Sequence, residues 1–144
     1  MNRILKTFRD NKKKVFIAYV VCGDPDISTT IKIMNTLVDS GVDLIELGVP
    51  FTDPIADGPV IQKSIERSLK KNTSLIDVFS VCKKFRKKNK TTPIVLMGYL
   101  NPIENLGYKK FSNTAVRSGV DGVLVVDSPP EESLTLSSIL QENN

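Results

Sequence analysis

The sequence contains no histidine and no tryptophan, and only two of its 144 residues are cysteine. The absence of histidine excludes Ser-His-Asp triads, Cys-His pairs, zinc sites built on imidazole, and histidine acid–base catalysis. Any acid–base chemistry must then use carboxylates, lysine, tyrosine or cysteine. Cys22 and Cys82 lie far apart without a CxxC spacing, so we interpret both as buried thiols rather than as a disulfide or a metal site.

Long apolar segments are also missing. The longest run, residues 15–22, ends at Gly23 and Asp24, and it is far shorter than the roughly 20 residues of a membrane span. The first residues carry neither a long apolar segment nor a small-residue cleavage site, so nothing marks the chain for secretion. We therefore expect a cytoplasmic protein with no membrane partner.

Positive charge is in modest excess, with 20 Lys and Arg against 16 Asp and Glu. The excess lies in two runs, residues 12–14 and 83–90. The second run follows apolar residues at helical spacing, which is typical of a helix end whose cations face the negative pole of the helix dipole. The first run has no aromatic residue and the second has only Phe85, so neither has the series of stacking aromatics that a single-strand binder uses. We expect solvated surface and no nucleic-acid partner.

Apolar segments alternate with amphipathic ones along the whole chain. Residues 15–21 form an unbroken apolar run that ends at a Gly-Asp-Pro turn, which is typical of a strand buried on both faces in a parallel sheet. The pattern predicts strands at 15–21, 42–48, 93–98 and 122–126, and helices at 2–11, 27–40, 60–69, 75–87, 104–118 and from about 130 onward. This alternation predicts the α/β class with a parallel sheet.

An internal repeat helps to choose between the possible α/β folds. The segment at 40–46, Ser-Gly-Val-Asp followed by apolar residues, recurs at 118–124, which is 78 residues, or two strand–helix units, later. The first strand is not followed by a GxGxxG motif, so a (β/α)₈ TIM barrel fits better than a dinucleotide-binding sheet. Because such a barrel needs roughly 250 residues, we expect residues 1–144 to be a single domain and a fragment, the N-terminal half of a barrel with its first four β/α units.

Glu46 is the first candidate for catalysis, since active sites of parallel barrels form where the strands end. It stands between Ile45 and Leu47, and pleating places it on the face opposite to theirs. If those two residues pack against helices, Glu46 points into the barrel, where burial favours the neutral carboxyl group that a general acid needs. A strand rotated the other way pairs Glu46 with an external Lys or Arg. The pattern alone leaves both alternatives open.

Asp57 is the second candidate, in the loop at 49–59. It stands just before a predicted helix, and its spacing alone favours a capping role over a catalytic one. Tyr19, Tyr99 and Asp127 mark the ends of three other predicted strands. Taken singly, each of these is only a core aromatic or a turn residue.

Several segments together resemble the α subunit of tryptophan synthase. Residues 46–62, ELGVPFTDPIADGPVIQ, resemble the family signature almost position for position. Gly-Asp-Pro at 23–25, MGYLNP at 97–102, and the segment 119–133 support the match. The resemblance extends over residues 15–133 and covers the first half of the family's barrel. The long signature is highly specific, whereas the shorter motifs are weak when taken singly.

The resemblance implies a lyase of tryptophan biosynthesis. The family cleaves indole-3-glycerol phosphate by a retro-aldol reaction to indole and glyceraldehyde 3-phosphate, and passes the indole to a β subunit within an α₂β₂ complex. Glu46 matches the catalytic glutamate and Asp57 the catalytic aspartate. By the same resemblance this subunit needs no metal and no organic cofactor.

The resemblance also assigns binding residues. Tyr19, Tyr99 and Leu124 line the indole pocket, and Asp53 and Asn101 lie toward the β subunit. Barrel phosphate sites are built after the seventh and eighth strands, and the sequence contains no Gly-rich phosphate cradle. Two alternatives therefore stay open: a non-catalytic half-barrel from a truncated gene, and another phosphate-binding barrel enzyme.

Overall fold

The computed structural model describes residues 2–10 and 14–143 and has a parallel sheet at its centre. Its four strands follow one another in chain order, β1-β2-β3-β4, and each pairs in parallel with the next. The strands are β1 (Ile17–Val21), β2 (Leu44–Gly48), β3 (Ile94–Gly98) and β4 (Gly122–Val125). The α/β class with a parallel sheet is confirmed. Asn11 and two lysines of the first basic run lie outside the described residues.

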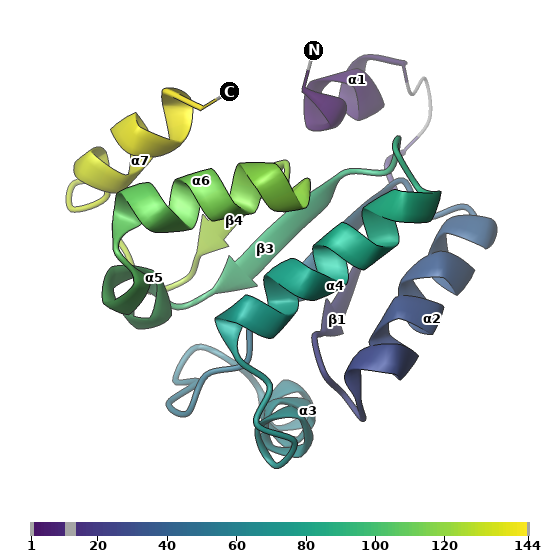
Figure 1. Cartoon of the computed structure of the whole chain (residues 1–144), viewed down its shortest axis with the longest axis horizontal. Coiled ribbons are helices and arrows are strands. Elements are labelled where there is room, and N and C mark those ends of the chain that lie inside the picture. The colour runs from purple at the N-terminus through teal and green to yellow at the C-terminus, as the bar shows by residue number, and fades with distance from the viewer. Residues whose placement is uncertain (1, 11–13, 144) are drawn as a thin grey trace.

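The main helices cover one face of this sheet. Figure 1 shows α2, α4 and α6 side by side against it, while α1 lies near the ends where the strands begin. Right-handed crossovers between strands in consecutive order place every connecting helix on the same side, as in a (β/α)₈ barrel. The helices are α1 (Arg3–Asp10), α2 (Ile27–Asp39), α3 (Pro59–Leu69), α4 (Leu75–Lys88), α5 (Leu100–Leu106), α6 (Tyr108–Ser118) and α7 (Leu134–Gln141).

The hydrophobic core fills the space between the sheet and these helices. Ile45 and Leu47 of β2 are fully buried there and belong to the same apolar cluster as Met34 of α2, Phe79 of α4 and Phe111 of α6. Because side chains alternate along a strand, the residues between them point to the other side of the sheet. We call that side the inner face. It carries Tyr19, Glu46, Gly48 and Leu124.

Two helix predictions were wrong in their bounds. The single helix expected at 104–118 is two helices, α5 and α6, that meet at Gly107, whose φ of +85° belongs to the left-handed region and ends the first helix. The helix expected from about residue 130 begins at Leu134, because the amides of Glu132 and Ser133 bond to the carbonyl of Pro129 and form a turn first.

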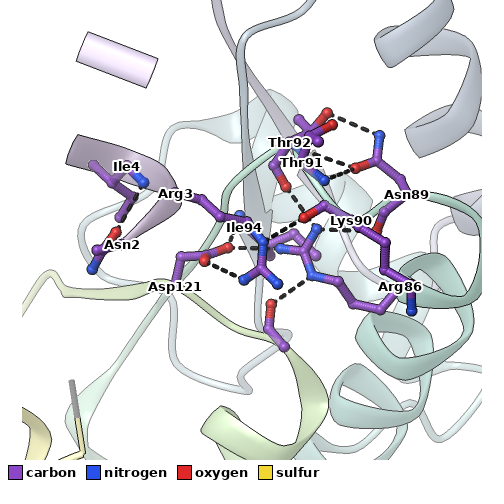
Figure 2. A network of polar contacts seen from close by, with 11 residues as sticks. Asn2, Arg3, Ile4, Arg86, Asn89, Lys90, Thr91, Thr92, Ile94 and Asp121 are labelled. Atoms are coloured by element: carbon purple, nitrogen blue, oxygen red, sulfur yellow. Dashed lines mark hydrogen bonds and ion pairs between the residues drawn. The ribbon is translucent and has the colours of Figure 1, made fainter. Parts of the chain in front are cut away.

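A polar network ties the strand starts to the first helix (Figure 2). The carboxylate of Asp121, just before β4, accepts from Arg3 of α1 at 2.7 Å, from Arg86 of α4 at 2.6 Å, and from the amide of Ile94 at 2.9 Å. Arg86 also donates to the carbonyl of Thr92 at 2.7 Å. This end of a barrel is the one associated with stability rather than catalysis. Among the described helices, none has the length and apolar character needed to cross a bilayer.

Candidate active site

Glu46 lies on the inner face, in the middle of β2. It pairs in register with Tyr19 of β1 and with Val95 of β3. Ile45 and Leu47 pack toward the helices, so the structure has the inward arrangement of the two left open by the sequence. None of the ion pairs among residues 2–10 and 14–143 involves Glu46. The Glu46 side chain is half-buried on this face.

Asp57 lies in the loop between β2 and α3, and its carboxylate is held by a residue of another strand end. The Tyr99 hydroxyl donates to Asp57 Oδ2 at 2.7 Å and accepts from the amide of Ala56 at 2.9 Å. The residue that caps α3 is Gly58, and Pro59 begins the helix. The capping role that the spacing favoured for Asp57 is wrong, because the carboxylate turns to Tyr99 instead.

The Tyr99 side chain is itself fixed by packing. Tyr99 is 3% exposed, and its ring stacks on Phe51 with a centroid distance of 5.1 Å. Burial, and then the hydrogen bond to Asp57, raise the Tyr99 pKa, so the phenol stays protonated and remains a donor.

Tyr19 lies near both carboxylates, Glu46 and Asp57. Burial raises the pKa of Tyr19 well above its usual range, and the neighbouring ionisable groups Asp57, Tyr99 and Glu46 raise it further, in that order. All of these groups therefore lie within electrostatic reach of one phenol. Gly48 makes room for it, because a Cβ at that position would stand 2.3 Å from the Tyr19 hydroxyl oxygen. A larger residue there would displace the ring.

The remaining predicted residues lie farther out. Leu124 is opposite Met97 in the register of β3 and β4, on the inner face, and is 40% exposed. Asp53 is exposed and accepts from its neighbour Thr52 at 2.6 Å, while Asn101 is exposed on α5. The structure thus brings Tyr19, Glu46, Asp57 and Tyr99 together, with Leu124 farther along the same face and Asp53 and Asn101 at the rim.

A cavity beside the loop is a separate feature. It has a volume of about 310 Å³ and is lined by the loop and the side of α3, including Asp53, Ile55 and Gln62, but not by Glu46 or Asp57. The inner face, rather than this cavity, carries the paired carboxylates. Among the described residues, no cluster of three carboxylate or thiol side chains could hold a metal ion.

The sequence analysis missed the residues that support the loop. Gln62 of α3 donates its side-chain amide to the carbonyl of Asp57 at 2.8 Å. Asp24, in the turn after β1, forms an ion pair with Arg67 of α3 at 2.7 Å. Gln62 stands inside the long signature and could have been examined for such a role. Asp24 and Arg67 are 43 residues apart, and no local spacing points to their pairing.

The fold and the position of the two carboxylates define a (β/α)-barrel protein, with its candidate site at the ends of the strands where barrel enzymes place their catalytic groups. The family model for the tryptophan synthase alpha chain matches residues 5–144. The chain belongs to this family.

Individual relatives agree with this family. The chain is 58% identical to the tryptophan synthase alpha chain of Vesicomyosocius okutanii, with 97% of this chain and 54% of the relative aligned. It is 55% identical to that of Nitrosomonas europaea, with 100% and 54% aligned. The chain therefore spans about half the length of the curated relatives that it matches.

Solved structures agree with the fold. The crystal structure of tryptophan synthase subunit alpha from Legionella pneumophila superimposes with a TM-score of 0.97 at 46% identity, over 99% of this chain and 56% of that one. A structure of the tryptophan synthase α₂β₂ complex from Pyrococcus furiosus gives 0.85 at 44% identity, over 90% of this chain and 52% of that one. The described strands and helices correspond to about the first four β/α units of this barrel.

Proposed function

We propose that the protein acts as a tryptophan synthase alpha chain, a lyase that cleaves indole-3-glycerol phosphate to indole and glyceraldehyde 3-phosphate. The observation that carries the proposal is the placement of two carboxyl groups at one end of the sheet: Glu46 pairs in register with Tyr19 on the inner face, and Asp57, in the loop after the same strand, is held by Tyr99. Retro-aldol cleavage of an indole substrate needs one carboxyl group that transfers protons and one that stabilises positive charge. This chain offers one of each kind.

In the first step, Glu46 as a carboxylic acid donates its proton to C3 of the indole ring. The ring nitrogen then carries positive charge, and its N–H donates to the ionised Asp57 carboxylate. Stabilising charge where it develops is the most effective form of electrostatic catalysis. The Tyr99 hydroxyl, which donates to Asp57 Oδ2 at 2.7 Å, holds that carboxylate in a fixed direction.

In the second step, the Glu46 carboxylate removes the proton from the side-chain hydroxyl on the carbon next to the ring. The C–C bond breaks, its electron pair returns to the ring to restore neutral indole, and the oxygen becomes the aldehyde of glyceraldehyde 3-phosphate. Glu46 is protonated again and ready for the next cycle. We assign Tyr19, Tyr99 and Leu124 to the walls of the indole pocket. No metal and no organic cofactor takes part in these steps.

The proposed partner is a tryptophan synthase beta subunit, which receives the indole. The Pyrococcus furiosus relative is part of an α₂β₂ complex. Asp53 is exposed in the loop after β2, and Asn101 is exposed in α5, which follows β3. We assign both to the contact with that subunit. We place the protein in the cytoplasm, in keeping with the biosynthetic role.

The experiment compares Glu46→Gln and Asp57→Asn with the wild type for indole release from indole-3-glycerol phosphate, with and without a beta subunit. Both variants should lose turnover while their circular dichroism spectra and melting temperatures stay unchanged. Glu66→Gln, at an exposed position of α3, is the matched control and should retain turnover. Turnover by Glu46→Gln would contradict the assignment of roles. A folded wild type that releases no indole would favour the non-catalytic half-barrel, and turnover of an unrelated phosphosugar would favour another barrel enzyme.

A further inference from the structure

A bidentate ion pair between Asp24 and Arg67 joins the turn after β1 to the helix α3. Arg67 donates from Nε to Asp24 Oδ1 and from a terminal nitrogen to Asp24 Oδ2, each at 2.7 Å, and the Ser64 hydroxyl donates to the same carboxylate. These bonds hold the pKa of Asp24 below its usual range. Parallel bonds from the planar guanidinium fix direction as well as distance.

Other close contacts hold the turn after β1 against α3. The Ser68 hydroxyl donates to the carbonyl of Cys22 at 2.6 Å in a buried position. A Cβ on Gly23 would stand 2.6 Å from the Ser68 hydroxyl and 2.2 Å from that of Thr73. Ser64, Arg67 and Ser68 follow helical spacing and share one face of α3, so this whole face is turned toward the end of β1.

The other end of α3 holds the Asp57 loop. Gln62 donates its side-chain amide to the carbonyl of Asp57 at 2.8 Å and to that of Pro54 at 3.4 Å. The Gln62 backbone amide bonds to Gly58 at 3.0 Å. The backbone of Asp57 is therefore carried by α3, while its carboxylate is tied to Tyr99. Any rotation of α3 would move Asp57 relative to both Tyr99 and Glu46.

We propose that Asp24 and Arg67 form a positioning pair, which sets the orientation of α3 and through Gln62 places Asp57 relative to Glu46. This inference rests on the proposed function, since it concerns the geometry of the same two carboxylates. The Arg67 side chain is 52% exposed, and partly exposed ion pairs add little to stability. The buried Ile65 and Ser68 already anchor α3 to the protein. The pair instead affects the alignment of Asp57 with Glu46. Displacements of catalytic groups by about 1 Å can lower the rate up to roughly a hundredfold.

The test measures kcat, KM and melting temperature for Arg67→Ala, Arg67→Lys and Asp24→Asn, on the protein in complex with a beta subunit. Arg67→Ala and Asp24→Asn should each lower kcat about tenfold or more, with KM within about twofold and little change in melting temperature. Arg67→Lys should recover only part of kcat, because a point charge cannot reproduce the two parallel bonds. The double variant should be no slower than either single one. Arg117→Ala, at an exposed position of α6, is the control.

An unchanged kcat in Arg67→Ala would overturn the positioning role, as would a loss of kcat that merely follows the loss of folded protein. A separate measurement keeps the inference independent of turnover. The amide of Ala56 donates to the Tyr99 hydroxyl, so its hydrogen exchange, followed by NMR, reports whether the loop is in place. Exchange should accelerate in Arg67→Ala and not in Arg117→Ala. If the wild type releases no indole, the proposed function fails, and this exchange result alone decides whether the pair positions the loop.

Discussion

The hydroxyl of Tyr99 donates a hydrogen bond of 2.7 Å to the carboxylate of Asp57, which joins the end of β3 to the loop after β2. The two residues are 42 positions apart in the chain. The contact turns a residue that the sequence offers as a helix cap into a carboxylate directed toward the ends of the strands. Asp57 depends on this bond for its orientation.

Replacing Tyr99 with Phe tests that dependence. The ring can still stack on Phe51, but the carboxylate loses its donor, and hydrogen bonds to charged groups contribute about 1.5–3 kcal/mol. We expect kcat/KM for indole release to fall about 10- to 100-fold, with the fold preserved. Tyr108→Phe is the control, because it removes a comparable bond to Glu104 of 2.8 Å at an exposed site. Wild-type kinetics in Tyr99→Phe would show that Asp57 needs no such support.

A substitution at Gly48 tests whether Tyr19 lines the indole pocket. A Cβ there would stand 2.3 Å from the Tyr19 hydroxyl oxygen and 2.8 Å from Cζ, so Gly48→Ala should push the ring aside and weaken indole binding. The double variant Gly48→Ala with Tyr19→Phe removes the atom in closest contact and should regain part of the affinity. Because the chain contains no tryptophan, indole fluorescence excited beyond the tyrosine absorption band reports binding without tryptophan background from the protein. Unchanged affinity in Gly48→Ala would place Tyr19 outside the pocket.

The fold was largely predictable because its signals are local. The apolar residues on both sides of Glu46 already predicted that it faces away from them, and only the side on which the helices pack was open. A capping residue predicted the start of α2: Asp26 accepts from the Thr29 amide at 2.8 Å and begins the helix as expected. The break at Gly107 was missed because the flanking residues continue a helical pattern through it.

The site was less predictable, since its contacts join distant segments. Nothing in the local spacing of Asp57 distinguishes a capping carboxylate from one held by Tyr99. The ion pair of Asp24 with Arg67 is likewise a product of the parallel topology, which brings the end of β1 next to α3. The resemblance to a known family identified the carboxylates, whereas the residues that support them emerged only from the three-dimensional structure.

The network around Asp121 should dominate stability at the opposite end of the sheet. The Arg86 and Asp121 side chains are 8% and 4% exposed, whereas that of Arg3 is 35% exposed. Asp121→Asn leaves a buried guanidinium without its counter-charge, and removing one partner of a buried pair costs about 3–5 kcal/mol. Arg3→Ala should cost about 1 kcal/mol or less. Urea unfolding measures both, and equal effects would contradict the central place given to the buried pair.

The two cysteines predict how stability depends on alkaline pH. Cys22 and Cys82 are both 0% exposed, and burial raises the pKa of each thiol from 9.0 to about 12. Between these values the unfolded chain loses thiol protons that the folded protein keeps. The free energy of unfolding is therefore at its full value below pH 9 and falls as the pH rises, by up to about 1.4 kcal/mol per pH unit for each thiol.

Cys82→Ala isolates this contribution, because the small apolar side chain keeps the site buried but removes one titrating group. Lysines and tyrosines also titrate in this range, but they are common to both proteins and cancel in the comparison. The slope of unfolding free energy against pH, from urea titrations at several pH values between 8 and 11, should be shallower in the variant. Equal slopes would show that the Cys82 thiol ionises as readily in the folded protein as in the unfolded chain. Burial also predicts that neither thiol reacts with Ellman's reagent until the protein unfolds.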